Sequence, residues 1–354
     1  MLRPCGYWGW RDGEQGPVKV VFDSRSVSDP DGVGRYSRCL LRALGKTAPA
    51  GDELLESPRP SSALRARNPD VFHTPWMDGA MLHSPCPTVV TIHDVSALKR
   101  RSEHLRTGLR LRLRHLAVQR AAMVIVPTAA VAGDAVAHLR LERERVVVIP
   151  EAADASMYQR SAPEIAAARQ RFSLPKQYLV WVGCLQHPSP GKHIAKLAAA
   201  RRELPLVLVG PTRPWAHELP DVILTGQVAD EQLAAIYSGA HALVLPSEDE
   251  GFGLTAVEAL ACGTPVVTCD VPALREVLDE RATFVAPGDI AGLIAAAQAV
   301  QRPAPSPSAW SWGDAARATW GVYARALAAA DGRRTVGRAP RRRPAAGIDS
   351  LEAQ

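Results

Sequence analysis

The side chains most suited to binding or catalysis lie in an acidic loop that contains glycine residues. Glu250 lies within residues 247–253, and Glu258 follows it after seven intervening residues, inside a predicted helix, so both carboxylates can face one wall of a cleft. The glycines allow a ligand to approach closely, and free amides at the helix start favour an anion. Because carboxylates accept hydrogen bonds from hydroxyl groups, the pattern indicates a ligand with both phosphate and polyol groups. We interpret Glu248 and Asp249 as surface acids, since three adjacent acids cannot all point inward.

A second loop carries a lysine suited to a phosphate group. Gly183 begins the stretch 183–193 after a predicted strand, and Lys192 lies near its end. A cation at this place would neutralise a diphosphate and stabilise the charge that develops on a leaving group. The alternative is a solvated loop lysine, because lysine is mostly found at protein surfaces.

Histidines end two neighbouring predicted strands. His93 and Asp94 close the strand 88–92, and His73 closes the strand 70–73. Ligands of open parallel sheets bind beyond the carboxyl ends of the strands, which favours a functional role for His93. For His73, a structural role is an equal alternative. We expect no metal site, because no fourth ligand accompanies these three side chains.

Two glycines follow the first predicted strand, residues 18–22. Gly32 and Gly34 form a GxG without a third glycine, so the dinucleotide fingerprint is incomplete, which counts against an NAD-dependent oxidoreductase. Asp29 and Asp31 flank a proline, and we interpret this short acidic motif as a turn rather than a metal site.

Alternating strands and helices must position these loops. Short apolar runs alternate with amphipathic stretches, which predicts parallel sheets covered by helices. The predicted strands are residues 18–22, 70–73, 88–92, 123–126, 145–149, 178–182, 206–209, 222–224, 242–245 and 265–268. The predicted helices include residues 34–45, 229–238, 254–262 and 312–330. An Ala-rich stretch that ends at Pro175 separates two such series, so we expect an α/β protein with two Rossmann-like, doubly wound domains facing a central cleft.

The stretch 233–285 resembles the donor-binding core of family 4 glycosyltransferases. The signature of this family is two glutamates, separated by seven residues around Gly-Phe-Gly, followed by Ala-x-x-x-Gly-x-Pro-Val-Val. Glu250 and Glu258 have this spacing, and the residues that follow them match as well: Ala259, Gly263, Pro265, Val266 and Val267. The resemblance extends over residues 18–328 and implies the two-domain GT-B fold.

The resemblance also implies roles for individual residues. Glu250 would contact the donor sugar, Glu258 the ribose hydroxyls, and His93 the donor sugar near the reacting carbon. Lys192 would neutralise the diphosphate. The remaining donor-site residues contribute mostly backbone and are Gly32, Gly34, Gly183, Gly226, Val228, Gly251, Phe252, Gly253 and Leu254.

One departure from the family pattern concerns the diphosphate. The family often pairs the lysine with an arginine, but the matching places hold Cys184 and Gly191. Arg213, which follows another predicted strand, is the substitute that we consider.

The implied activity is transfer of a hexosyl group from a nucleoside-diphosphate sugar, with UDP or GDP favoured, to an acceptor hydroxyl, with retention and without a metal or other cofactor. The acceptor would be a glycan, a lipid-linked glycan or a small molecule. The alternatives are a catalytically weak sugar-nucleotide-binding protein, motivated by Cys184 and Gly191, and a sugar-nucleotide epimerase or a phosphorylase of the same fold.

The two series of alternating strands and helices define the domain organisation that we expect. Residues 1–17 form an N-terminal extension, 18–165 the acceptor-side domain, and 166–308 the nucleotide-sugar-binding domain. Residues 309–330 form a helix that crosses back to the first domain, and 331–354 a disordered basic tail. The stretch 45–70 is short for the usual set of strand, helix and strand, so we expect a trimmed acceptor side.

Charge and composition exclude several classes of protein. The net charge is +6, and residues 332–354 carry six arginines against one aspartate and one glutamate, so the rest of the chain is close to neutral and does not suit a nucleic-acid binder. No apolar run is long enough to span a membrane, and six scattered cysteines without CxxC suggest a reducing cytoplasm.

Residues 99–120 are strongly basic and contain a stripe of leucines. Two readings are open: contact with the inner face of an anionic membrane, or an ordinary helix with its leucines in the core. We favour the core, and we keep a weak peripheral membrane contact as the alternative. The leucines are Leu105, Leu109, Leu113 and Leu116.

Overall fold

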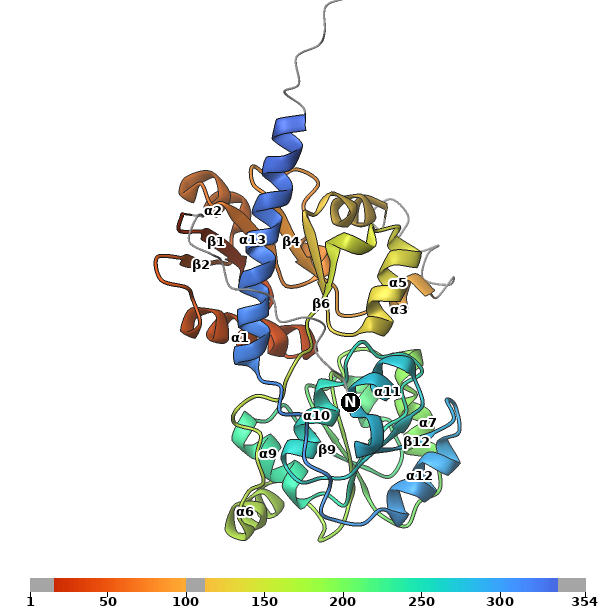
Figure 1. Ribbon diagram of the computed structural model, residues 1–354. Helices are drawn as coiled ribbons and strands as arrows, with labels where there is room; N and C mark the ends of the chain where they lie inside the picture. Colours follow the sequence, from red (N-terminus) through yellow and green to blue (C-terminus); the bar gives the residue numbers. More distant parts are fainter. Residues whose placement is uncertain (1–15, 100–111, 337–354) are drawn as a thin grey trace, which may run out of the picture.

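Two parallel sheets of six strands each form the framework of the molecule (Figure 1). The computed structural model describes residues 16–99 and 112–336. The strand order is β2-β1-β3-β4-β5-β6 in the first sheet and β12-β11-β10-β7-β8-β9 in the second. Neighbouring strands pair in parallel throughout. The arrangement confirms the predicted α/β class with two doubly wound, Rossmann-like domains.

The first domain is built on apolar strands and on helices with defined caps. Its strands are β1 (Lys19–Asp23), β2 (Glu53–Ser57), β3 (Val71–Thr74), β4 (Thr88–Thr91), β5 (Met123–Val126) and β6 (Val146–Val148). Its helices are α1 (Gly32–Lys46), α2 (Pro60–Arg67), α3 (Ser96–Lys99), residues 112–120 and α5 (Ala129–Leu139). Asp31 caps α1 by accepting a hydrogen bond from the Gly34 amide at 3.0 Å. The two predicted glycines, Gly32 and Gly34, therefore lie in the first turn of α1.

The second domain repeats this plan. Its strands are β7 (Leu179–Val182), β8 (Leu206–Val209), β9 (Val222–Gly226), β10 (Ala242–Leu245), β11 (Val266–Cys269) and β12 (Ala282–Val285). Its helices are α6 (Ala162–Phe172), α7 (Ile194–Ala199), α8 (Pro214–His217), α9 (Asp230–Gly239), α10 (Leu254–Ala261), α11 (Pro272–Leu278) and α12 (Ile290–Ala299). Ser161 and Glu164 form a capping box that starts α6. Helix α6 packs against α9.

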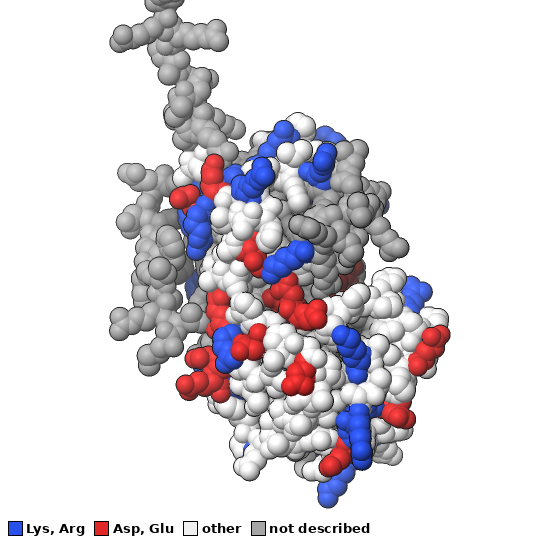
Figure 2. All heavy atoms as spheres, turned by 90° about the vertical axis from the view of Figure 1, so that its right-hand side faces the viewer, with Lys and Arg blue, Asp and Glu red and all other residues white. Residues whose placement is uncertain are grey.

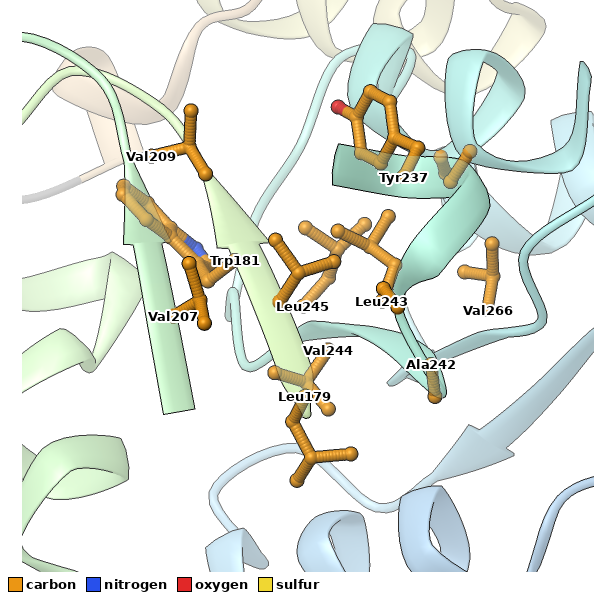
Figure 3. Packing of buried hydrophobic residues seen from close by; sticks show 14 of the residues in the cluster. Leu179, Trp181, Val207, Val209, Tyr237, Ala242, Leu243, Val244, Leu245 and Val266 are labelled. Carbon is orange, nitrogen blue, oxygen red and sulfur yellow. The ribbon is translucent and has the colours of Figure 1, made fainter. Parts of the chain in front are cut away.

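The core of the second domain lies on both faces of its sheet. Figure 3 shows Trp181 beside Val207 and Val209 on neighbouring strands, and Tyr237 of α9 above Leu243. These side chains are buried, as expected for parallel strands that helices cover on both faces. The same strands end at the loops that carry the candidate site residues.

The last described helix, α13 (Trp312–Val336), runs from the second domain along the first (Figure 1). It packs on α1, and Trp320 and Tyr323 belong to the hydrophobic core of the first domain. The indole of Trp320 donates a hydrogen bond to the Leu44 carbonyl at 3.3 Å. Helix α13 therefore packs on the first domain, although it follows the second domain in sequence.

The stretch 45–70, although short, contains both a strand, β2, and a helix, α2. Strand β2 was not predicted because it is an edge strand, paired to β1 alone, and its sequence Glu-Leu-Leu-Glu-Ser is largely accessible to solvent. Strand β12 was missed for the same reason.

Charges of both signs are interspersed over the face that Figure 2 shows. Charged side chains of the molecule also form ion pairs, for example Arg275 with Asp270 at 2.5 Å. A single-sign field of the kind that attracts nucleic acid does not cover this face.

Candidate functional site

The loop after β10 meets the carboxyl end of β4 at very short range. A Cβ atom at Gly251 would lie 1.8 Å from the backbone carbonyl of His93, so only glycine fits this contact. The hydroxyl of Thr128, the residue that caps α5, donates to the Gly251 carbonyl at 3.0 Å. The strand ends of the two domains therefore face each other where the sequence places the site.

Lys192 and Glu250, both predicted site residues, contact each other. Lys192 ends a short 3₁₀ turn, Pro190–Lys192, and its Nζ lies 2.9 Å from Glu250 Oε1. The Ser247 hydroxyl donates to the same carboxylate oxygen at 2.7 Å. A ligand that engages this cation and this carboxylate must share or replace their contact.

Glu248 and Asp249, the two acids that precede Glu250, form ion pairs of their own. Glu248 lies 2.6 Å from His193 Nε2, and Asp249 lies 3.1 Å from Lys99 Nζ. The side chain of Glu248 is half exposed and that of Asp249 about a quarter exposed. Lys99 belongs to the first domain, so its ion pair with Asp249 spans the cleft.

Glu258, the second predicted carboxylate, is buried in α10 with a relative accessibility of 1%. Arg35 of α1 reaches across from the first domain, and its Nε lies 3.1 Å from Glu258 Oε1. The same guanidinium lies 2.6 Å from Asp230 of α9. Burial raises the pKa of Glu258 to about 7, although Arg35 acts to lower it.

Sequence reasoning missed Arg35. Its only signal was its position next to Gly34, directly after the first strand. Its partners Glu258 and Asp230 lie about two hundred positions further along the chain, and only the facing of the domains brings them together. Arg213, the substitute cation that we considered from the sequence, is exposed at the start of α8.

The imidazole of His93 is held on both sides. Its Nδ1 lies 2.9 Å from Glu151 Oε1, and its Nε2 lies 2.9 Å from the carbonyl oxygen of Pro75. The ring of Tyr36 packs edge-on against it at a centroid distance of 4.5 Å. Glu151 follows β6, so the strand-end rule that selected His93 would also have selected Glu151.

His73 lies in a buried chain of hydrogen bonds instead. Its Nδ1 is 2.8 Å from the Tyr323 hydroxyl and its Nε2 is 3.0 Å from the Thr91 hydroxyl, which contacts Tyr36 at 3.1 Å. Burial, with a smaller contribution from His93, lowers the pKa of His73 to about 3. This geometry favours the structural role for His73.

The remaining predicted residues of the second domain lie near strand ends or at the start of α10. Gly253 is the N-cap of α10 with φ +86°, and a Cβ there would lie 2.4 Å from Leu274. Phe252 is buried in the core of the second domain, and Leu254 and Val228 pack against that core. Gly226 ends β9 with φ +70°. At Gly183, a Cβ would lie 2.6 Å from the Trp181 ring.

Two open cavities, of about 470 and 400 Å³, lie elsewhere. Both are lined by Met81, Leu82 and His83, and neither includes Glu250 or Glu258. In residues 16–99 and 112–336, no group of three His, Cys, Asp or Glu side chains is arranged to hold a metal ion.

The structure corrects the packing that we favoured for the leucine stripe. Leu113 and Leu116 are 41% and 46% exposed, not buried in the core. Leu105 and Leu109 lie outside the described residues. Within the described part of the chain, no helix is long and apolar enough to cross a membrane.

Two protein-family models match the chain. Residues 18–156 match a model described as Glycosyltransferase Family 4, and residues 177–302 match one described as Glycosyl transferases group 1. Together the two models span most of both domains.

Individual relatives match over shorter stretches. The chain is 26% identical to the O-antigen chain mannosyltransferase B of Escherichia coli over 259 residues, which is 67% of this chain and 66% of that protein. It is 47% identical over 73 residues to the O-antigen chain mannosyltransferase RfbU of Salmonella typhimurium, 20% of this chain and 21% of that protein. In both cases the match covers less than two thirds of the relative.

Among solved structures, Alr3699/HepE of Anabaena in complex with UDP-glucose is similar with a TM-score of 0.63. The match covers 90% of this chain and all of the other at 18% identity. At this identity, the likeness shows the shared fold of two facing domains.

Proposed function

Because this chain belongs to the family 4 glycosyltransferases, which have the GT-B fold, we propose that it transfers a glycosyl group from a nucleoside-diphosphate sugar to an acceptor hydroxyl. The observation that carries the proposal is the pairing of Lys192 with Glu250 in the loop before α10, the helix that contains the buried Glu258. Together, the turn, the loop and the helix offer a cation for phosphate and two carboxylates for hydroxyl groups, as the ligand requires.

In the proposed complex, each of these side chains contacts one part of the donor. Lys192 neutralises the diphosphate, Glu250 accepts hydrogen bonds from the sugar, and Glu258 accepts them from the ribose hydroxyls. The contact between Lys192 and Glu250 then opens, so that both side chains turn to the donor. The structure of Alr3699/HepE with UDP-glucose supports a nucleotide sugar as the class of donor.

We further propose that the reaction proceeds with retention and without a metal. Lys192 supplies positive charge where the leaving diphosphate develops negative charge, which is the usual dominant contribution to such catalysis. The leaving phosphate helps to deprotonate the acceptor hydroxyl. The protein contributes positioning, and closure of the domains excludes water.

The donor sugar is proposed to be a hexose carried by UDP or GDP. Two relatives are named as mannosyltransferases, and one structural neighbour contains UDP-glucose. We propose a glycan, a lipid-linked glycan or a small molecule as the acceptor.

A thermal-shift panel of UDP, GDP, ADP and TDP, each with and without magnesium, tests the donor site. We expect one nucleotide to raise the melting temperature, independently of magnesium, and Lys192→Met to lose most of this shift. Lys196→Met is the matched control, because Lys196 is an exposed lysine in the following helix α7. Absence of a shift with all four nucleotides would contradict the proposed donor site.

Weak contact with an anionic membrane is a further part of the proposal. Leu113 and Leu116 are exposed beside Arg112 and Arg114 on the helix 112–120, a combination that binds anionic lipid surfaces. Sedimentation with phosphatidylglycerol vesicles should retain the protein, and Leu113→Glu with Leu116→Glu should release it. Equal retention by neutral phosphatidylcholine vesicles, or none by either, would contradict this contact.

A further inference from the structure

Three strand ends of the first domain converge on the imidazole of His93. His93 itself follows β4, Pro75 follows β3 and Glu151 follows β6. The side chain of Glu151 is 3% exposed and that of His93 is 17% exposed. With the Tyr36 ring packed edge-on, the imidazole is held on several sides and remains partly exposed.

The hydrogen bonds restrict where the protons of this pair can lie. The Pro75 carbonyl can only accept, so Nε2 must carry a proton and donate it at 2.9 Å. The contact of 2.9 Å between Nδ1 and Glu151 Oε1 then needs one further proton. If Glu151 is ionised, this proton lies on Nδ1 and the ring is an imidazolium. If the ring is neutral, Glu151 must be protonated instead.

The charges around the ring favour the imidazolium. Burial alone would lower the pKa of His93, but the hydrogen bond and charge of Glu151, the Pro75 carbonyl and Asp94 outweigh it, so the pKa is raised. The other titratable groups that face the ring are Tyr36 of α1 and His73 of β3, both buried.

The loop after β10 approaches the backbone of His93 through Gly251. The titratable residues that directly precede Gly251 in the sequence are Asp249 and Glu250. Both of these acids are already paired with lysines.

We infer that Glu151 is a positioning residue that holds His93 as an imidazolium, with Nδ1 fixed by the carboxylate and Nε2 always a hydrogen-bond donor. The role rests on the proposed function and on the expectation from the family resemblance that His93 lies near the reacting carbon of the donor sugar. A hydrogen bond from a charged donor is roughly twice as strong as one from a neutral group. A ring that keeps its orientation needs no reorganisation when negative charge develops nearby.

The wild-type protein alone provides the first test. In ¹⁵N-histidine-labelled protein at pH 7.5, the His93 signals, assigned by their loss in His93→Gln, should show a bonded proton on both ring nitrogens. A bare Nδ1 beside a protonated Nε2 would overturn the inference. This readout does not depend on donor or turnover, so it stands apart from any failure of the proposed function.

The second test removes the charge of Glu151 and keeps its shape. In Glu151→Gln, the titration midpoint of His93 should fall by about one pH unit or more. Glu142→Gln is the control, because Glu142 is an exposed acid just before β6 that pairs with Arg145. A purely structural role would lower thermal stability and leave the His93 titration unchanged, and that result would overturn the inference.

The pH dependence of kcat/KM tests whether the charge on His93 matters for turnover. With a donor that is turned over, the alkaline limb of the kcat/KM profile should move to lower pH in Glu151→Gln by the same amount as the His93 midpoint. An unmoved alkaline limb, together with a shifted His93 midpoint, would show that the charge on His93 does not matter for turnover and would reject its role in the reaction.

Discussion

Two buried side chains near the site respond to pH in opposite directions. The pKa of His73 is lowered to about 3, so below its ordinary value of about 6.5 the unfolded chain takes up a proton that the folded protein does not. The pKa of Glu258 is raised to about 7, so in the folded protein this group takes up a proton first as the pH falls. As the pH falls, the titration of His73 therefore lowers the free energy of unfolding, whereas the titration of Glu258 raises it over an overlapping pH range.

Substitution of His73 separates these contributions. Between pH 6.5 and 5, the free energy of unfolding of the wild type should fall by about 1.6 kcal/mol relative to that of His73→Gln. Chemical denaturation of both proteins at the two pH values measures this difference, in which the contribution of Glu258 cancels. A difference that does not change with pH would show that His73 titrates normally in the folded protein.

Removal of the Lys192 charge should affect turnover more than folding. The ammonium group lies on a partly exposed 3₁₀ turn, so Lys192→Met should change the melting temperature little. Loss of one group that stabilises developing charge costs about 10²–10³ in kcat. Steady-state kinetics beside Lys196→Met check this expectation, and an unchanged rate would mean that the diphosphate is held elsewhere.

At the level of elements, helix α13 couples the packing of the first domain to the site. Trp320 is buried against α1, and its neighbour Tyr323 contacts His73. Thr91 then links His73 to Tyr36, which packs on His93. The orientation of the candidate catalytic histidine thus depends on a helix more than two hundred residues away in sequence.

Truncation of Trp320 tests whether the buried face of α13 anchors this helix to the first domain. Trp320→Ala leaves a cavity and removes the hydrogen bond from the indole to the Leu44 carbonyl, and should destabilise the protein by about 3–5 kcal/mol. Arg317→Ala is the control, because its pair with Asp314 on the same helix is exposed and should contribute within about 0.5 kcal/mol. Thermal unfolding measures both, and similar losses in the two variants would show that α13 is not anchored by its buried face.

Local sequence predicts where most of the strands and the acidic loop lie. It does not predict which distant residues contact the side chains of the site. Apolar runs such as β7 and β10 are readable because both faces of the strand are buried, whereas edge strand β2 carries no such run. The spacing of Glu250 and Glu258 is local and was readable too. The contact of Arg35 with Glu258 depends on how two domains face each other, and no local pattern encodes it.

For the whole molecule, the contacts across the cleft describe a closed state. Arg35 joins α1 to Asp230 and Glu258, and Glu276 of α11 accepts hydrogen bonds from the amides of Ala129 and Ala130 at the start of α5. A carboxylate is favourable at a helix N-terminus. These polar contacts can be exchanged for contacts with a ligand, which suits a cleft that must open to admit one.

Loss of Arg35 should open the cleft. In Arg35→Ala, the closed form of the protein would bury Glu258 without its cation, which should destabilise that form by about 3–5 kcal/mol. Small-angle X-ray scattering should therefore give a larger radius of gyration for Arg35→Ala than for Arg38→Ala. Arg38 is the matched control because it bonds only carbonyls of its own domain among its described hydrogen bonds. Equal radii would show that Arg35 does not hold the domains together.

We propose above all that the chain turns over nucleoside-diphosphate sugars. Release of nucleoside diphosphate from UDP- and GDP-hexoses, followed by NMR in the wild type and in Glu250→Ala, measures this activity directly. We expect release from one donor by the wild type and none by Glu250→Ala, which should still fold. Nucleotide binding without release by the wild type, or equal release by both proteins, would contradict it.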